Sequence, residues 1–189
     1  MNILAMNVGS SSIKYKVYDN DKFIFGGKLE RVRDFRESIK DIIKHLNESD
    51  IKIDVVGNRI VYAGFVEKNE IINEKVIKKI EKYNELAPLH NIPELEAVKE
   101  LAKLKIKQVA VYDSLFYKDL PKRAYMYALP YKYYKKYGIR KIGFHGISHS
   151  YVSEFIGRKK IISCHSGAGC SITAIKNGKA IDTSMGFTP

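Results

Sequence analysis

The chain has 189 residues, a length that fits one large domain or one and a half ordinary ones. Hydrophobic residues make up 45% and charged residues 29%, which is typical of a folded globular protein and excludes a collagen-like or largely disordered chain. The formal charge of +12 would attract polyanions, whether nucleic acid, an anionic membrane or phosphorylated small molecules. No apolar run approaches the roughly 18 residues of a membrane span, and no signal-peptide pattern follows Met1, so we expect a cytoplasmic protein.

The N-terminal third shows the alternation of a three-strand antiparallel meander followed by a helix. The expected strands cover residues 3–6, 13–21 and 22–28. Apolar residues at helical spacing then predict a helix over 33–49, with Asp34 as its cap. One face of that helix can cover the sheet.

The middle of the chain predicts two more strands and two more helices. The strands are expected over 53–62 and 106–113, and the helices over 74–83 and 92–104, with Pro93 in the first turn of the latter. With the meander they predict an α/β fold, a mixed five-stranded sheet covered by helices. Ligands of such sheets gather at strand ends.

The composition changes in residues 120–141, a tract rich in tyrosine and basic residues that marks a boundary between sub-structures. A short helix is expected over 149–158. Residues 160–184 then give a strand, a loop of small residues, a strand, a turn and a strand, which repeats the order of the N-terminus. Gly9 and Gly167 hold equivalent places in this weak internal duplication.

Two loops of small residues carry the strongest chemical signal: NVGSSSIK at 7–14 and HSGAGCS at 165–171. Glycine lets backbone N–H groups approach a ligand, serine adds short donors, and Lys14 could add a charge, so such a turn can wrap phosphate oxygens. Two copies on facing domains could grip one polyphosphate from both sides. Neither loop follows GxxxxGK[ST] or GxGxxG, and a tight hairpin without a ligand also favours these residues.

Two charged residues lie at informative places on expected strands. Asp113 ends an apolar strand, where it either positions an attacking oxygen or a metal ion, or is simply a polar strand terminus. Arg59 has apolar neighbours and needs an anionic partner, which can be a carboxylate of the protein or of a substrate.

Histidines and cysteines give weaker signals. His145 and His149 have the i, i+4 spacing of a zinc pair, but no third ligand is near in sequence, and the glycines around His145 indicate a turn. There it can donate to a transferring phosphoryl group; the same interpretation applies to His165, which can equally be a satisfied strand-end residue. Cys164 and Cys170 are too few for a disulfide scaffold and are expected to be reduced, partly buried thiols.

Taken together and in order, these segments resemble the acetate kinase family over nearly the whole chain. The matching segments are NVGSSSIKYKV, NRIVYAG, APLHN, VAVYDSLF, YALPYKYYKKYGIRKIGFHGISHSYVSE, CHSGAGCSI and AIKNGKAIDTSMGFTP. The resemblance implies a ribonuclease H-like fold of the actin and sugar kinase type, with a phosphate-binding hairpin in each of two related domains. Residues 1–117 would be the first domain, and 118–189 the connecting segment and first three strands of an incomplete second one.

The resemblance also implies an activity: transfer of the terminal phosphoryl group of ATP to acetate, with Mg²⁺ screening the charge. Asp113 would orient the acetate oxygen and His145 would stabilise the transition state. Arg59 would bind the carboxylate, with Val61 and Phe144 in the pocket for the methyl group. The remaining implied site residues are Asn7 at the metal and, at the nucleotide phosphates, Ser10, Ser12, Lys14, His165, Gly167 and Gly169.

Several residues depart from the family pattern. Asn58, Tyr62 and Tyr117 stand where members carry histidines, Ile92 replaces a proline, and Ser166 and Ala168 replace the leucine and asparagine of the second loop. Losing that asparagine removes a phosphate donor, which puts the affinity or the choice of phosphate donor in question. A slightly larger acyl pocket would take propionate or butyrate in place of acetate, because one methylene changes discrimination by only roughly 1–3 kcal/mol.

The largest departure is length, because the sequence stops before the family's transition-state arginine, adenosine-binding part, metal-sharing glutamate and C-terminal helix. We therefore expect the isolated chain to be inactive or very slow, and to form a homodimer or bind a separately encoded C-terminal half. A fragment, a split protein and a decayed one all stay open. So do two other functions: a nucleotide- or anion-binding module without turnover, and single-stranded nucleic-acid binding through residues 125–141.

Overall fold

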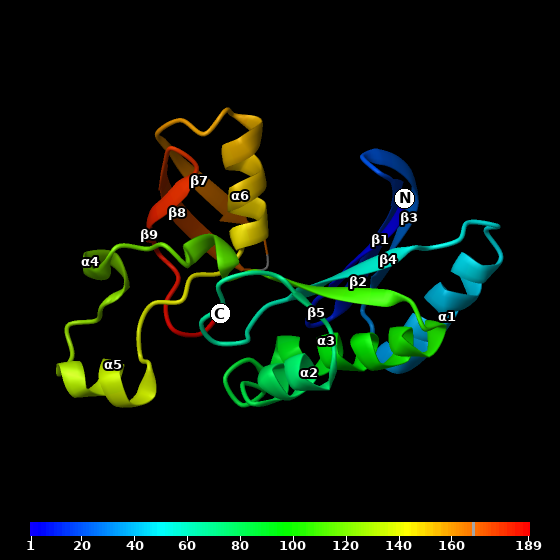
Figure 1. The fold of residues 1–189 in the computed structure, drawn as a ribbon, viewed down its shortest axis with the longest axis horizontal. Coiled ribbons are helices and arrows are strands. Elements are labelled where there is room, and N and C mark those ends of the chain that lie inside the picture. The colour runs from blue at the N-terminus through cyan, green and yellow to red at the C-terminus, as the bar shows by residue number, and fades with distance from the viewer. Residues whose placement is uncertain (168) are drawn as a thin grey trace. The chain divides into compact units, whose positions relative to one another are not determined.

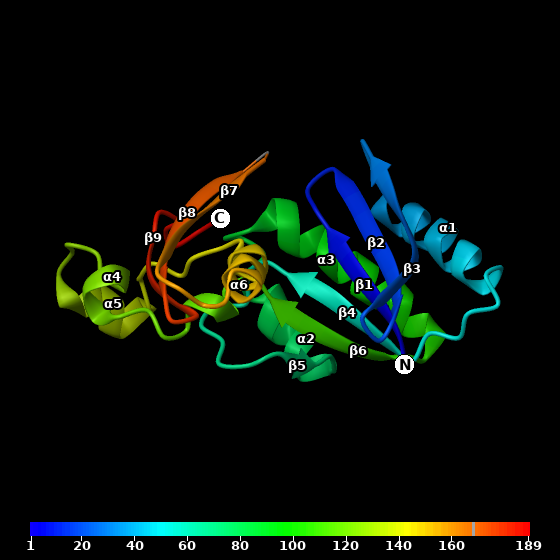
Figure 2. The same cartoon turned by 90° about the horizontal axis from the view of Figure 1, so that it is seen from above.

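A six-stranded sheet in the order β3-β2-β1-β4-β6-β5 organises the first part of the chain (Figures 1 and 2). Its strands are β1 (Asn2–Val8), β2 (Ser12–Asp19), β3 (Lys22–Glu30), β4 (Val55–Ile60), β5 (Glu70–Ile71) and β6 (Lys107–Tyr112). The first three form the antiparallel meander expected from the sequence, and β4 runs parallel to β1. The sixth strand, β5, has only two residues and gives no alternation pattern, so the sequence indicated five strands.

The structure is a computed structural model that describes residues 1–167 and 169–189, so the expectation about Ala168 lies outside the described residues. The chain divides into two units. The first holds Met1–Ala63 and Asn69–Val111, and the second holds Gly64–Lys68 and Tyr112–Pro189. No helix of the described ranges is long and apolar enough to cross a membrane.

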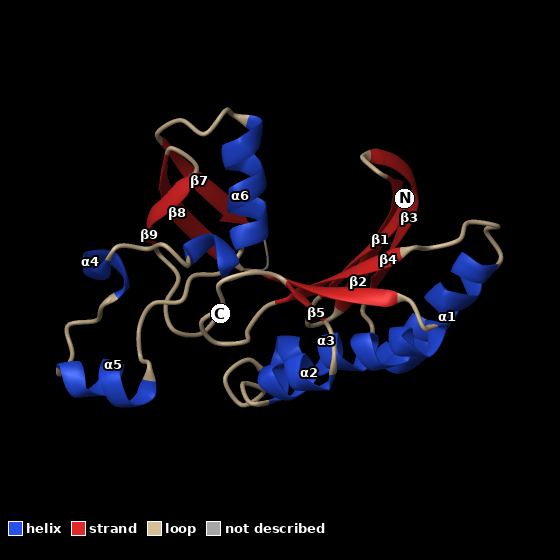
Figure 3. Cartoon of the chain, in the orientation of Figure 1, coloured by secondary structure: helices blue, strands red, loops and turns tan. Residues whose placement is uncertain are grey.

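Three helices cover one face of the six-stranded sheet (Figure 3): α1 (Phe35–Asn47), α2 (Glu74–Glu81) and α3 (Pro88–Leu101). Asp34 caps α1 by accepting a hydrogen bond from the backbone N–H of Glu37 at 2.9 Å, as the sequence predicts. The expected start of α3 is wrong, because Pro93 lies inside the helix and Pro88 occupies its first turn. Pro88 is tolerated there since the first N–H groups of a helix need no intrahelical partner.

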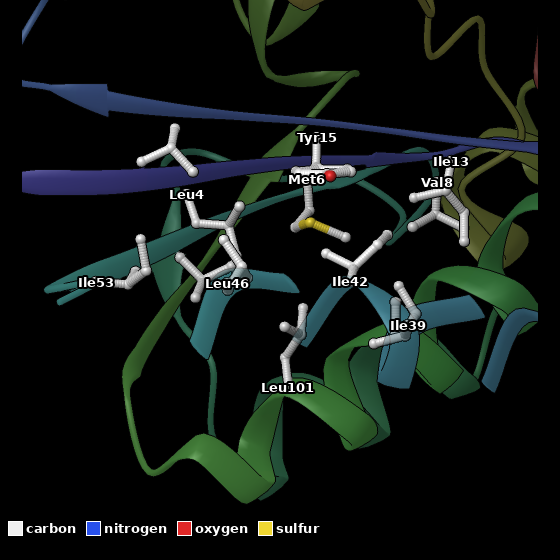
Figure 4. Close-up of a cluster of buried hydrophobic side chains, with 13 residues drawn as sticks. Leu4, Met6, Val8, Ile13, Tyr15, Ile39, Ile42, Leu46, Ile53 and Leu101 are labelled. Carbon is white, nitrogen blue, oxygen red and sulfur yellow. The ribbon is translucent and has the colours of Figure 1, made fainter. Parts of the chain in front are cut away.

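The core of the first unit lies between the sheet and the helices (Figure 4). Alternate residues of β1 and β2 point into it, and α1 adds residues at helical spacing. Its members include Leu4, Met6, Val8, Ile13, Val17, Ile39, Ile42, Leu46 and Leu101. Burying one such side chain stabilises the fold by about 1.5–3 kcal/mol. The alternation places Asn7 of β1 and Lys14 of β2 on the other face of the sheet.

A three-stranded antiparallel sheet and one helix organise the second unit. The strands are β7 (Ile161–Ser166), β8 (Cys170–Lys176) and β9 (Lys179–Thr183), and α6 (Gly146–Phe155) lies along them (Figure 1). Asn177 and Gly178 connect β8 to β9 with φ values of 53° and 79°, the left-handed conformation that an Asn-Gly hairpin turn requires.

Two expectations about this unit are wrong, the start of one helix and the burial of the cysteines. The helix α6 begins at Gly146, three residues earlier than expected. The tyrosine-rich tract, for which no element was predicted, contains two helices, α4 (Lys122–Tyr125) and α5 (Tyr131–Tyr137). Their backbone preference was hidden because the tract has almost no aliphatic periodicity. Cys164 and Cys170 are exposed, because the alternate residues Ser163 and Ser171 take the buried positions on β7 and β8.

Candidate functional site

The first small-residue loop is the turn between β1 and β2. The backbone N–H of Gly9 donates to the carbonyl of Ser12 at 2.8 Å, which closes the turn. Ser10 and Ser11 are exposed at its tip, and Ser12 is half-buried. The turn therefore presents hydroxyl and backbone donors to solvent, which an anion can use.

Beside this loop, three polar side chains line up across β2, β1 and β4. Asn7 pairs with Lys14 in the antiparallel register, and Arg59 Nη1 donates to Asn7 Oδ1 at 3.1 Å. Asn7 and Lys14 are exposed, and Arg59 is half-buried. All three lie on the sheet face that the helices leave uncovered, so two positive charges and an amide oxygen share one surface. Such a surface suits an anion with an associated cation.

Residues next to Arg59 are buried and hydrogen-bonded inside the first unit. Asn58 is buried and donates to Gln108 Oε1 at 2.9 Å, and Tyr62 is buried with its carbonyl accepting from Asn91 Nδ2 at 2.8 Å. Val61 is buried as well, and its N–H donates to Glu94 Oε2 at 3.1 Å. The departure from the family pattern at Asn58 is thus accommodated by a side-chain hydrogen bond, and the one at Tyr62 by burial of its ring edge-on to Tyr83, both inside the first unit.

In the second unit, Asp113 holds the start of α6. Its carboxylate accepts from the backbone N–H of His145 at 2.8 Å, and its own carbonyl accepts from the N–H of Gly146 at 3.0 Å. Asp113 is 1% exposed. A negative charge at a helix N-terminus is favourable, so Asp113 has a positioning role whatever else it does.

The glycines around His145 are required by close packing. A Cβ on Gly146 would lie 2.1 Å from the carbonyl oxygen of Asp113, and one on Gly143 would lie 2.4 Å from the ring of Tyr117. His145 has φ 59° and is the N-cap of α6, so the turn predicted at this residue is confirmed. Between them, Phe144 is fully buried, and its carbonyl accepts from the Tyr117 hydroxyl at 2.8 Å.

The second small-residue loop connects β7 to β8 and lies against His145. The N–H of Gly167 donates to the carbonyl of Gly169 at 2.9 Å. A Cβ on Gly169 would lie 3.2 Å from Cε1 and 3.4 Å from Nε2 of His145. The ring of His165 stacks on that of His145 with 4.2 Å between centroids. Asp113, His145, His165 and this loop therefore form one cluster inside the second unit.

Behind His145 lie two serines that the sequence did not indicate, Ser163 and Ser171, together with His149. His149 is fully buried, and its two ring nitrogens lie 2.9 Å from Ser163 Oγ and 2.8 Å from Ser171 Oγ. Ser171 Oγ also lies 2.8 Å from His145 Nδ1. Burial, followed by the nearby imidazoles of His165 and His145, lowers the pKa of His149 to about 4. Both ring nitrogens of His149 are thus in hydrogen bonds with serines, and the described part of the chain has no group of three or more His, Cys, Asp or Glu that could hold a metal.

Tyr117 adds a hydroxyl to the buried polar layer formed by Ser163, His149, Ser171 and Thr173. Its hydroxyl bonds Thr173 Oγ1 at 2.8 Å as well as the Phe144 carbonyl, and burial raises its pKa to about 12. A phenol that stays neutral here can act as donor to the carbonyl. Tyr117 is therefore structural, although it stands where family members carry a histidine.

The fold defines the class: a mixed α/β protein of the actin-like type. The fold class expected from the sequence is confirmed. The model of the Acetokinase family matches residues 24–189, and the chain belongs to this family.

Individual relatives support this family assignment. The chain is 40% identical over 232 residues to the acetate kinase of Caldanaerobacter subterraneus subsp. tengcongensis, covering 100% of this chain and 58% of that protein. Among solved structures, the acetate kinase of Porphyromonas gingivalis is 34% identical with a TM-score of 0.84, and a propionate kinase from Francisella tularensis subsp. tularensis gives the same two values. Each structural match covers 100% of this chain and 58% of the other. The chain thus spans little more than half the length of these relatives.

Proposed function

We propose that this chain carries the carboxylate-phosphorylating part of an acetate kinase-type phosphotransferase, which moves the terminal phosphoryl group of ATP to acetate and yields acetyl phosphate and ADP. Membership of the Acetokinase family supports the reaction class. The single observation that carries the proposal is the cluster of Asp113, His145, His165 and the glycine loop in the second unit. It combines a carboxylate, two imidazoles and a glycine-rich loop of the kind that can bind phosphate.

In the proposed reaction, Asp113 orients the attacking oxygen of acetate, and His145 donates a hydrogen bond to the negative charge that develops on the transferring phosphoryl group. Arg59 binds the carboxylate through its planar guanidinium. Val61 and Phe144 line the site for the methyl group. The donors of Ser10, Ser12, Lys14, His165, Gly167 and Gly169 bind the nucleotide phosphates.

The exposed Asn7 supports a magnesium site. Mg²⁺ takes hard oxygen ligands and usually keeps several waters and substrate phosphates, so one or two protein oxygens suffice. The amide oxygen of Asn7 would be such a ligand through its second lone pair, because the first accepts from Arg59 on the same sheet face. When bound, the cation would neutralise phosphate charge, while Lys14 and Arg59 hold the anionic groups on either side of Asn7.

The acyl substrate is a small carboxylate. One solved relative is an acetate kinase and another a propionate kinase, each 34% identical to this chain. We propose acetate as the preferred substrate. Comparing kcat/KM for acetate, propionate and butyrate tests this choice, and a preference for either longer acid would overturn it.

Assembly belongs to the same proposal. We propose that the chain acts with further polypeptide, either a second copy or a separately encoded C-terminal half. The exposed apolar side chains Ile162 and Ile172 on the outer face of β7 and β8 support such a contact. Light scattering of the chain alone, and mixed with the C-terminal part of a longer relative, distinguishes the two partners; a monomer in both samples contradicts the proposal.

The decisive experiment is a phosphotransfer assay. Acetyl phosphate is trapped with hydroxylamine after incubation with Mg-ATP and acetate, for the chain alone and with the C-terminal part of a longer relative. We expect turnover in the mixture, and a loss of about 10²-fold in Asp113→Asn, because losing the group that orients the attacking oxygen misplaces it. The variant keeps an oxygen acceptor for the N–H of His145. Asp119→Asn, at an exposed aspartate that pairs with Lys179, is the matched control.

The alternative function, a nucleotide- or anion-binding module without turnover, predicts a different result. Mg-ATP would then bind to the chain, detected by calorimetry, while no mixture produces acetyl phosphate. Absence of both binding and turnover would contradict the two functions together.

A further inference from the structure

Four side chains behind the candidate site form a continuous hydrogen-bonded row. In order they are Ser163, His149, Ser171 and His145, with successive distances of 2.9, 2.8 and 2.8 Å. His149 is fully buried, and Ser163 and Ser171 are 5% and 1% exposed. The row starts on β7, crosses α6 and β8, and ends at Nδ1 of His145.

When both imidazoles are neutral, two arrangements use every hydrogen of the row within it, because a third, in which Ser171 accepts from both rings, leaves the buried Ser171 hydroxyl without an acceptor in the row. A neutral imidazole has one N–H and one bare nitrogen, and a serine hydroxyl has one hydrogen. Either every hydrogen points from Ser163 toward His145, or every hydrogen points the other way. The two arrangements put the N–H of His145 on opposite ring nitrogens.

The start of the row distinguishes the two arrangements. If the hydrogens point toward Ser163, its hydroxyl accepts from His149 Nδ1 and must donate its own hydrogen elsewhere. Among the described residues, the side chain of Ser163 makes one hydrogen bond, which joins it to His149. A buried donor without an acceptor is costly, whereas an oxygen with an unused lone pair is tolerated. The hydrogens therefore run from Ser163 toward His145.

We propose that Ser171 and His149 are positioning residues that keep the hydrogen of neutral His145 on Nε2. Ser163 donates to His149 Nδ1, His149 Nε2–H donates to Ser171 Oγ, and the Ser171 hydroxyl donates to His145 Nδ1. The inference rests on the proposed function for its purpose, because Nε2 is the ring atom beside Gly169 in the second loop. His145 then has a donor aimed at the place where we propose the phosphoryl group lies.

Other features of the cluster agree with this direction. The low pKa of His149, about 4, keeps that ring neutral, so it has the bare nitrogen that Ser163 needs. The titratable groups around His145 include His165, stacked on its ring, Asp113, bonded to its backbone N–H, and His149, across Ser171. His165 is hydrogen-bonded to a different serine, because its Nδ1 lies 3.0 Å from Ser148 Oγ. The Ser148–His165 pair is a natural control because it neighbours the row without joining it.

Ring-nitrogen NMR of the ¹⁵N-labelled full chain tests the proposal near pH 8, above the ordinary histidine pKa of about 6.5. In the unaltered chain we expect the hydrogen on Nε2 and a bare Nδ1 in both His145 and His149. This measurement needs no variant, so it stands even if a variant fails to fold. A hydrogen on Nδ1 of either ring would overturn the proposal.

Variants then test the coupling. Ser171→Ala removes the donor to Nδ1, and losing one hydrogen bond should lower the Nε2–H to Nδ1–H ratio of His145 about fivefold. His149→Met should lower it in the same way, whereas His149→Gln, whose amide can donate to Ser171, should restore it. Ser148→Ala should leave it unchanged. An unchanged ratio in folded Ser171→Ala would overturn the proposal. The readout needs no turnover, so a failed phosphotransfer assay leaves it interpretable.

Discussion

The two sheets of this molecule are covered by helices in chemically different ways. In the first unit, α1 and α3 cover β1, β2 and β4 mainly through aliphatic side chains at alternate positions of the strands. In the second unit, the residues of β7 and β8 that are buried toward α6 include Ser163, Ser171 and Thr173, and α6 contributes His149. In the first unit, apolar burial holds the helices on the sheet, whereas in the second unit hydrogen bonds make much of the contact between α6 and the sheet.

The two kinds of contact have different consequences: apolar contacts stabilise the fold, and hydrogen bonds orient individual side chains. Apolar contacts are non-directional, so they stabilise a sheet without fixing the orientation of any one ring. Hydrogen bonds contribute less net free energy but have defined geometry, and they hold the imidazole of His145 in place. The first unit should therefore respond most to lost volume, and the second to pH and to lost hydroxyl groups.

The largest effect is expected from Leu101→Ala in α3. Leu101 is fully buried in the core of the first unit, so the change removes apolar contacts and leaves a cavity. We expect the free energy of unfolding of this unit to fall by about 2–5 kcal/mol, measured by hydrogen exchange of the β1 and β4 amides. The control is Leu89→Ala on the same helix, where the side chain is 69% exposed and a small effect is expected. Equal losses would show that the unit is not held by its core.

A pH effect should be confined to the second unit. His149 has a pKa of about 4 in the fold against 6.5 when unfolded, so the unfolded chain binds more protons between these values. Stability is therefore fully present above pH 6.5 and is lost as the pH falls toward 4, by roughly 3 kcal/mol. Hydrogen exchange of β7 and β8, corrected for intrinsic rates at each pH, measures the loss.

His149→Gln removes this titrating group and should flatten the pH dependence of the second unit. His45→Gln, at an exposed histidine of α1, should leave it as it is. A parallel loss of protection in β1 and β4 of the unaltered chain would contradict the contrast between the two layers.

Sequence reasoning succeeded where the pattern is apolar and periodic. The alternation in β1 and β2, the helical spacing of Ile39, Ile42 and Leu46, and the cap at Asp34 all predicted the observed elements. It failed where tertiary contacts decide. The first turn of α3 is held by Asn91, a fully buried side chain that donates to the carbonyls of Tyr62 and Ile80, and no local signal reports those bonds.

The candidate site shows the same limit. The sequence singled out the small-residue loops, Asp113 and His145 because glycine turns and strand ends are local features. It did not single out Ser163 or Ser171, because two serines on adjacent strands meet His149 only when β7 pairs with β8 and α6 packs against both. Burial of these serines also explains the exposed cysteines beside them, a point that composition alone could not decide.

The smallest effect we predict tests the hydroxyl of Tyr117 against one outside the polar layer. Tyr117→Phe keeps the ring in the second-unit core but removes the hydroxyl from the Phe144 carbonyl and from Thr173. We expect the second unit to lose about 1–3 kcal/mol, the cost of leaving buried polar groups unsatisfied, while the first unit is unchanged. The matched control is Tyr151→Phe on α6, where the side chain is 68% exposed and its hydroxyl can bond water. If both changes had the same effect on hydrogen exchange of the β8 amides, the hydroxyl of Tyr117 would contribute no stability beyond the burial of its ring. The second unit would then be stabilised by apolar burial, like the first.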